Sequence, residues 1–264
     1  MLRDRKDFRA HDILGNIAIV KFSENVKEKN KKQFANKILK ENKSVKTILE
    51  KTGKVKGRLR KIQTRYLAGE NTKEVLYREN GCVFRFNVDK TYFSSRLSNE
   101  RKEIASYIKK GELVLVMFAG IAPFPIVIAR NSQAKKIYSN EINREANKYA
   151  KLNIELNKFK NKIELIPGDI KKVATKLKGM KFDVIVMPRP QLKESFLKEA
   201  FMLSKNRTKI YYYDFCKEDE INSIVEKVKG EAKKYKKKIK IIRVKKAGDI
   251  APRRYRIRVD FVVL

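Results

Sequence analysis

A glycine turn followed by a distant acidic residue is the strongest chemical pattern in this chain. The apolar run 113–118 breaks at Ala119-Gly120, and a second strand-like run ends in Glu141, 21 positions after Gly120. In open α/β sheets such a turn lets a ligand approach the backbone, and a carboxylate at the next strand end can accept from two ribose hydroxyls. The dinucleotide fingerprint Gly-x-Gly-x-x-Gly is absent from the sequence. The pattern therefore favours S-adenosylmethionine (SAM), which has no phosphates, over a pyrophosphate-bearing cofactor.

A further strand end extends the predicted cofactor site. Asp169 and Ile170 follow the third strand after Gly168, where an acid can accept from an adenine amino group and an apolar neighbour can cover the ring. Gly-Asp alone is ordinary turn chemistry, but ligands of open α/β sheets bind at the carboxyl ends of the strands. The predicted SAM-binding residues are Phe118, Ala119, Gly120, Glu141, Ile142, Asp169, Ile170 and Met187.

A stiff loop, Met187-Pro188-Arg189-Pro190, ends the fourth strand. In nucleobase methyltransferases this loop faces the base that accepts the methyl group, and two prolines restrict its shape. Arg189 can hold a phosphate or a base edge in that position. The alternative is an ordinary strand that is terminated by proline.

An aromatic and charged segment, residues 92–101, precedes a predicted helix. Ser98, Glu100 and Arg101 fit a helix cap, but aromatic and arginine side chains at a domain junction also suit a base that is held for chemistry. Arginines with fork-shaped donors are predicted to form a basic face for phosphates: Arg58, Arg60, Arg65, Arg253, Arg254, Arg256 and Arg258. The predicted substrate-binding residues are Arg96, Pro188, Arg189, Arg253 and Arg254.

The charge balance predicts a polyanionic partner. The chain has 65 Lys and Arg against 30 Asp and Glu, a net charge of +35. Self-repulsion opposes compaction, so such a surplus usually serves contact with nucleic acid. The alternative is a lysine-rich proteome, which would give the same surplus. Hydrophobic residues make up 42% of the chain, which can supply a folded core and argues against disorder.

The sequence has few cysteine and histidine residues, which limits the kinds of metal site, catalytic triad and disulfide that it can form. The sequence has only Cys82, Cys216 and the single histidine His11, so it predicts neither a metal cluster, nor a histidine-dependent triad, nor a disulfide scaffold. It contains neither a signal peptide nor an apolar run long enough to span a bilayer. We therefore expect a cytoplasmic, monomeric protein without a metal or a membrane partner.

Two domains are expected from the spacing of apolar runs. Residues 1–86 combine short strands, separated by glycines, with one basic helix near 27–46, and they predict a small α+β domain. Residues 87–264 alternate strands and helices, which is typical of a doubly wound, mostly parallel sheet. The last two strand-like runs, 239–244 and 255–264, predict an antiparallel hairpin at the sheet edge. That ending is typical of SAM-dependent methyltransferases.

Taken in order, these segments resemble the archaeal and eukaryotic tRNA (guanine-37-N1) methyltransferase family. The resemblance runs from His11 to the C-terminus and is carried by DILGNIAIV, GRLRKIQTRYLAGE, ENGCVFRFNVDKTYFSSRLSNER, VMFAGIAPF, NEIN and APRRYRIRVDF. It implies a Rossmann-like class I SAM-dependent methyltransferase domain preceded by a small RNA-binding domain. It also implies methyl transfer to N1 of the guanine next to the anticodon, with the tRNA anticodon stem-loop as partner.

The resemblance assigns roles to matching positions. Glu100 matches the general base, and Arg60 matches the arginine that neutralises the charge developing on the guanine. Tyr92 matches an aromatic residue of the active-site segment, and Glu141 matches the ribose-binding acid. The relative that transfers an aminocarboxypropyl group has a different segment in place of YFSSRLSNER, so methyl transfer is favoured.

Three positions depart from the family pattern. Val116 replaces an Asp, Ala122 replaces the second glycine of Gly-x-Gly, and Met187–Pro190 replaces an Asn-Leu-Pro or Asn-Pro-Pro loop. The chain is also expected to lack the N-terminal domain that grips the tRNA elbow. Two alternatives stay open: another SAM-dependent transferase of the wybutosine pathway, such as an aminocarboxypropyl transferase, and a catalytically silent tRNA-binding homologue.

Overall fold

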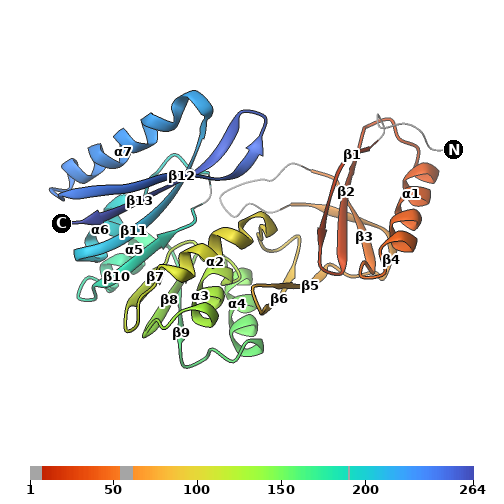
Figure 1. The fold of residues 1–264 in the computed structure, drawn as a ribbon. Helices are drawn as coiled ribbons and strands as arrows, with labels where there is room; N and C mark the ends of the chain where they lie inside the picture. Colours follow the sequence, from red (N-terminus) through yellow and green to blue (C-terminus); the bar gives the residue numbers. More distant parts are fainter. Residues whose placement is uncertain (1–7, 54–61, 190) are drawn as a thin grey trace. The chain divides into compact units, whose positions relative to one another are not determined.

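The computed structural model describes residues 8–53, 62–189 and 191–264. The chain forms two compact units, which Figure 1 shows in sequence colours. Unit 1 consists of Met1–Glu79 and Val83–Ser95, and unit 2 consists of Asn80–Cys82 and Arg96–Leu264. The division falls after Ser95, whereas the sequence predicts a boundary after residue 86.

Unit 1 is a small sheet covered by one helix. Its four-stranded sheet has the order β1-β2-β3-β4, and helix α1 connects the parallel strands β2 and β3. Two short strands, β5 and β6, form a separate sheet. The elements are β1 (Phe8–Leu14), β2 (Ile17–Phe22), α1 (Glu28–Glu41), β3 (Thr47–Lys51), β4 (Thr64–Gly69), β5 (Glu74–Glu79) and β6 (Cys82–Asn87).

The core of unit 1 follows from the apolar spacing of its elements. Ala35 and Ile38, which are the buried residues of α1, pack against the apolar side chains of β2, β3 and β4. The turn between β1 and β2 requires Gly15, because its φ is +56° and an added Cβ would lie 1.9 Å from the Leu76 carbonyl oxygen.

Unit 2 is built on a seven-stranded sheet with the order β12-β13-β11-β10-β7-β8-β9. The five neighbouring strands β11, β10, β7, β8 and β9 all run parallel to one another. Strand β13 lies between β11 and β12 and is antiparallel to both. The strands are β7 (Leu113–Val116), β8 (Lys136–Glu141), β9 (Ile163–Pro167), β10 (Phe182–Met187), β11 (Ser204–Lys217), β12 (Ile239–Ala251) and β13 (Arg254–Val263). The prediction of a doubly wound sheet with an antiparallel edge hairpin is confirmed.

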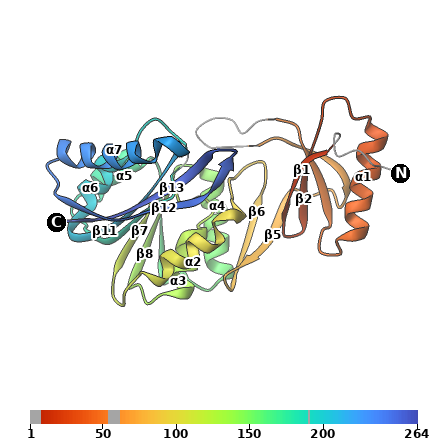
Figure 2. The same ribbon diagram turned by 45° about the horizontal axis from the view of Figure 1, so that its top comes forward.

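Helices cover both faces of the large sheet, as Figures 1 and 2 show. Helices α2, α3 and α4 lie on one face, and α5, α6 and α7 pack on the other, where they share a core with β7, β10, β11 and β13. They are α2 (Ser98–Ser106), α3 (Pro123–Asn131), α4 (Arg144–Leu156), α5 (Ile170–Lys176), α6 (Leu197–Leu203) and α7 (Ile221–Lys234), with the short 3-10 helices η1 (Ser95–Leu97) and η2 (Glu218–Glu220). None of the helices in the described part of the chain is long and apolar enough to cross a membrane.

Candidate active site

The parallel strands bring the predicted cofactor residues to one edge of the sheet. The Ala119 N–H donates to the Asn140 carbonyl at 2.8 Å, which links the end of β7 to the end of β8. The Gly168 N–H donates to the Glu141 carbonyl at 2.8 Å, which links β8 to the loop after β9. Carboxyl ends of adjacent parallel strands are the usual ligand site of such sheets.

Glu141 and the glycine turn are in direct contact. The Gly120 N–H donates to Glu141 Oε2 at 2.8 Å, and the Asn143 N–H donates to Oε1 at 2.8 Å. The backbone on both sides therefore fixes the orientation of this carboxylate. A carboxylate can accept several hydrogen bonds, so this orientation is compatible with acceptance from ribose hydroxyls.

Asp169 and its neighbours form the second part of the cofactor edge. Asp169 is the N-cap of α5, where its Oδ1 accepts from the Lys171 N–H at 3.0 Å. The Asn140 amide holds the preceding turn by donating to the carbonyls of Ile166 (2.8 Å) and Gly168 (3.0 Å). Two carboxylates at neighbouring strand ends provide acceptors for ribose and adenine groups, and the half-buried Ile142 offers apolar cover. The Ile170 side chain, which the sequence predicts to cover the adenine ring, is only 2% exposed and belongs to the core. This set of residues fits SAM.

Met187 and Ala122 are both fully buried at this edge. The Met187 side chain is fully buried in the core, so only its backbone can face a cofactor. Ala122, which is also fully buried, has φ +67°, a left-handed conformation that costs an L-residue about 1–2 kcal/mol relative to glycine. The turn keeps the conformation of a glycine at this position although the glycine has been replaced.

The loop after β10 is held by the side chain that was predicted to contact substrate. Arg189 is buried, and its Nη1 donates to Asp214 Oδ1 at 2.5 Å. Its Nη2 donates to the carbonyls of Glu194 (2.6 Å) and Leu192. A phosphate contact by Arg189 would require some of these internal bonds to break. Pro188 beside it is half-buried.

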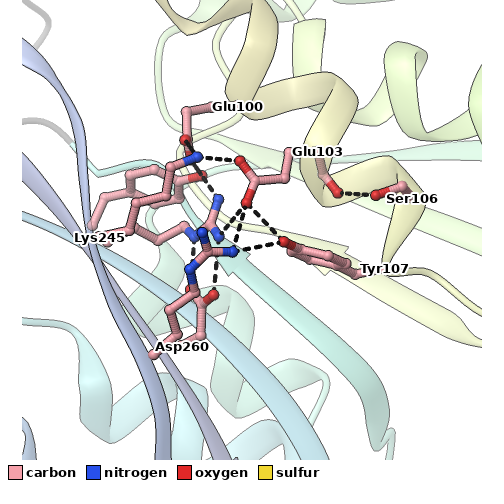
Figure 3. Close-up of polar contacts among 9 residues, drawn as sticks. Glu100, Glu103, Ser106, Tyr107, Lys245 and Asp260 are labelled. Carbon is pink, nitrogen blue, oxygen red and sulfur yellow. Dashed lines mark hydrogen bonds and ion pairs between the residues drawn. The ribbon is translucent and has the colours of Figure 1, made fainter.

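Glu100 lies in the first turn of α2 and is only 4% exposed. Its Oε2 accepts from Arg258 Nη1 at 2.6 Å and from the Tyr213 hydroxyl at 3.0 Å, and its Oε1 pairs with Lys245 Nζ at 2.8 Å (Figure 3). The alternative that Glu100 serves as a helix cap is wrong, because its carboxylate is bound by side chains of β11, β12 and β13.

Glu103, one helical turn further along α2, joins the same cluster. Its Oε1 accepts from Arg258 Nη2 at 3.0 Å and from the Tyr107 hydroxyl at 2.7 Å, and its Oε2 contacts Lys245 (Figure 3). Arg258 also forks onto Asp260 at 2.7 and 3.0 Å. Buried charges are tolerated only when they are paired in this way. We call these residues (Glu100, Glu103, Tyr107, Tyr213, Lys245, Arg258 and Asp260) the charge cluster.

The charge cluster corrects one prediction from the sequence. Arg258 was predicted to form part of a basic face for phosphates, but it is fully buried and binds three carboxylates. Burial, and next the charge of Glu100, raise the pKa of Tyr213 well above its usual value. The Tyr213 hydroxyl therefore stays protonated and donates to Glu100.

Glu103 makes the cluster sensitive to acid. Burial by itself would raise the pKa of Glu103, but hydrogen bonds from Lys245, Arg258 and Tyr107 lower it to about 2 from 4.5. Because the pKa of Glu103 is lower in the folded than in the unfolded protein, ionised Glu103 stabilises the fold by about 3 kcal/mol at a pH above its unfolded-state pKa. That stability is lost as the pH falls from about 5 to about 2. We expect Glu103→Gln to show a shallower loss of stability over this range in urea unfolding followed by circular dichroism. Equal slopes for the two proteins would contradict this assignment.

Two of the remaining predicted site residues, Arg96 and Arg253, share a groove. A groove of about 380 Å³ runs between η1 and the tip of the β12–β13 hairpin, and both Arg96 and Arg253 line it together with Tyr255. Arg254 is exposed in the same hairpin. Tyr92 belongs to unit 1 and is half-buried. Arg60 lies outside the described residues.

Comparison with known proteins fits this geometry. A model described as the TRM5/TYW2 methyltransferase domain matches residues 75–242, and one described as the TYW2 N-terminal domain matches residues 4–72. The tRNA (guanine(37)-N(1))-methyltransferase Trm5b of Pyrococcus abyssi is 34% identical over 253 residues, which are 96% of this chain and 74% of the relative. The chain belongs to the TRM5/TYW2 methyltransferase family. The crystal structure of that Trm5b superposes with a TM-score of 0.84.

Other members of the TRM5/TYW2 family differ in their reactions. A Nanoarchaeum equitans protein, named tRNA (guanine(37)-N(1))/4-demethylwyosine(37)-methyltransferase Taw22, is 34% identical. The match covers 97% of this chain and 100% of the relative. The structure of Methanocaldococcus jannaschii TYW2 in complex with AdoMet is 26% identical, covers 96% of this chain and 99% of its own, and has a TM-score of 0.73. The predictions of the family, of the Rossmann-like fold and of SAM as cofactor are confirmed.

Among the described residues, no group of three or more His, Cys, Asp or Glu side chains could hold a metal ion. The sequence missed Lys245, Tyr213 and Asp214 as parts of the site. Their signal was weak, because Tyr213 and Asp214 lie within a continuously buried run of β11 and Lys245 lies in β12, whose residues are mostly exposed.

Proposed function

We propose that this protein is a SAM-dependent tRNA methyltransferase that methylates N1 of guanine 37, next to the anticodon. The observation that carries the proposal is Glu100, a buried carboxylate that Arg258, Lys245 and Tyr213 hold in one orientation. The Trm5b relatives, at 34% and 32% identity, support the choice of N1 of guanine. Support for a tRNA partner comes from the net charge of +35 and from the similar structure of aTrm5 with tRNALeu, at 29% identity and a TM-score of 0.83.

The reaction requires a base and an electrostatic partner. N1 of neutral guanine carries a proton, so its lone pair becomes available for the methyl carbon only when a base takes that proton. Glu100 is 4% exposed and is bound by three donors, so in this proposal its carboxylate exchanges one of these contacts for the N1–H of the bound guanine and then accepts that proton. Arg60, by resemblance, stabilises the negative charge that develops on O6. Bound SAM supplies a methyl group that is already electrophilic because it is attached to a sulfonium.

The carboxylate of Glu141 is proposed to bind the SAM ribose. Glu141→Ala removes its acceptors and the contact with Gly120, and it should weaken SAM binding by about 1–3 kcal/mol, measured by calorimetry. Glu164→Ala is the matched control, because Glu164 lies on the next strand, is 53% exposed and pairs with Lys136. If Glu141→Ala binds SAM as tightly as the control does, the ribose assignment is wrong.

Nucleoside mass spectrometry tests the proposed reaction directly. The protein is incubated with SAM and tRNA transcripts carrying G37 or A37, and the digested nucleosides are quantified. We expect 1-methylguanosine from the G37 transcript alone. Its absence, with SAM still bound in calorimetry, would refute methylation of guanine N1, and absence of SAM binding would favour a silent RNA-binding protein.

A second candidate reaction is methylation of 4-demethylwyosine at the same position. It is favoured by the Nanoarchaeum equitans relative, which is named for both substrates and is covered along its whole length. A Methanocaldococcus jannaschii aminocarboxypropyltransferase is also 32% identical over 220 residues. Transcripts that carry 4-demethylwyosine, assayed beside the G37 transcript, separate these reactions by the mass of the product.

A further inference from the structure

Arg189 is a buried arginine in a loop that borders the cofactor edge. Strand β10, which this loop follows, pairs in parallel with β7, and the Met117 N–H donates to the Val186 carbonyl at 2.9 Å. The loop therefore begins beside the glycine turn that follows β7. None of the Arg189 guanidinium is exposed to solvent, although a charged side chain is rarely buried without a specific set of partners.

The partner of Arg189 in the sheet is Asp214 of β11. Asp214 Oδ1 accepts from Arg189 and from the Phe215 N–H (2.9 Å), while Oδ2 accepts from the Tyr212 hydroxyl (2.6 Å) and from Lys227 (2.9 Å). Burial would raise the pKa of Asp214, but Arg189 and the hydrogen bonds from Tyr212 and Lys227 lower it. Asp214 thus stays ionised and is a fixed anchor on an interior strand of the sheet.

The other side of the guanidinium holds the loop itself. Nη2 donates to the carbonyls of Leu192 and Glu194, so one side chain links two points of the loop to Asp214. Beyond these bonds, the Phe196 ring packs edge-on against Phe118 with centroids 5.0 Å apart. Both phenylalanines have left-handed backbones, with φ +59° and +58°. The loop is thereby joined to the turn that is predicted to contact SAM.

We infer that Arg189 is a positioning residue, which fixes residues 191–196, before α6, in the shape that presents the acceptor base to the methyl group. The inference rests on the proposed function. Arg189 acts through the loop and does not touch the substrate. Because the Glu141 carboxylate is oriented by the backbone N–H groups of Gly120 and Asn143 and not by side chains of this loop, loss of Arg189 should slow methyl transfer at saturating SAM without weakening SAM binding. A side chain with a merely structural role would lower the thermal stability alone.

The test compares Arg189→Met, Asp214→Asn and the double variant in single-turnover methyl transfer at saturating SAM. We expect each single variant to lose about tenfold or more in rate, with the SAM dissociation constant within about threefold of the wild type. The double variant should be at most about threefold slower than the slower of the two single variants. The effects of residues that act as one unit do not add. Arg189→Lys should recover little, since an ammonium cannot reproduce the fork of donors.

Thr208→Val is the control for instability. Thr208 is fully buried and donates to the Phe182 carbonyl at 2.6 Å, at the opposite end of β10 and β11. It should lower the melting temperature and leave the single-turnover rate within about twofold. Three results would each overturn the inference. The rate of Arg189→Met could lie within threefold of the wild-type rate, the rate losses of the two single variants could add strictly in the double variant, or Thr208→Val could lose as much rate as Arg189→Met. Should Arg189→Met not fold, Asp214→Asn and Arg189→Lys carry the same comparison. A wild-type protein that makes no methylated guanosine would instead refute the proposed function.

Discussion

Glu100→Gln is expected to lower the single-turnover rate of methyl transfer by about 10²- to 10⁴-fold, because it removes the general base. SAM affinity should stay close to that of the wild type, since the contact between Glu141 and Gly120 is separate from the charge cluster. The loss should be partly recovered at high pH, where guanine N1 loses its proton without a base. The rate, measured with excess protein over labelled SAM across a pH series, checks both expectations.

Glu103→Gln is the matched control for this experiment. Glu103 lies on the same helix and contacts the same Lys245 and Arg258, so its replacement removes the same charge from the same cluster. We expect its rate to stay within about tenfold of the wild type, because positioning is disturbed but the base remains. A Glu100→Gln protein that methylates at near wild-type rate, or a Glu103→Gln protein that loses as much, would contradict the assignment of Glu100 as base.

The fold and the meeting of the strand ends at one edge of the sheet could be predicted because they depend on short-range patterns. Strand ends followed by glycine and an acid are recognisable in the sequence, and parallel strands must bring their carboxyl ends together. Gly120 and Glu141 therefore meet at 2.8 Å as the pattern predicts. The departure at Ala122 was also visible, although its left-handed backbone could be seen only in the structure.

The environment of Glu100 could not be predicted from the sequence. Arg258 lies 158 positions away, and an arginine in a basic C-terminal run is usually solvated. Its burial follows from the position of β13 between β11 and β12, because a strand inside the sheet turns alternate side chains toward the helices that cover it. The partner of Arg189 was hidden for a similar reason, since Asp214 lies 25 positions away, within a buried run of β11.

Arg258→Met is expected to destabilise unit 2 by about 3–5 kcal/mol, because removal of one partner leaves buried charges without compensation. Arg258 binds Glu100, Glu103 and Asp260 at 2.6 to 3.0 Å and is itself fully buried. The free energy of unfolding, from urea titrations followed by circular dichroism, measures the effect. Arg130→Met is the control, because Arg130 is exposed and contacts only the Phe159 ring among the interactions described for it.

The pH dependence separates loss of charge pairing from loss of packing in Arg258→Met. Without the arginine, the pKa values of Glu103 and Asp260 should rise, so the folded variant binds protons more readily than the folded wild type does. Its stability deficit should therefore shrink as the pH falls from about 7 toward about 4, since protonation removes the uncompensated charges. A lost packing contact would give a deficit that does not change with pH. A deficit under about 1 kcal/mol at neutral pH would show that Arg258 is not the residue that holds the charge cluster together.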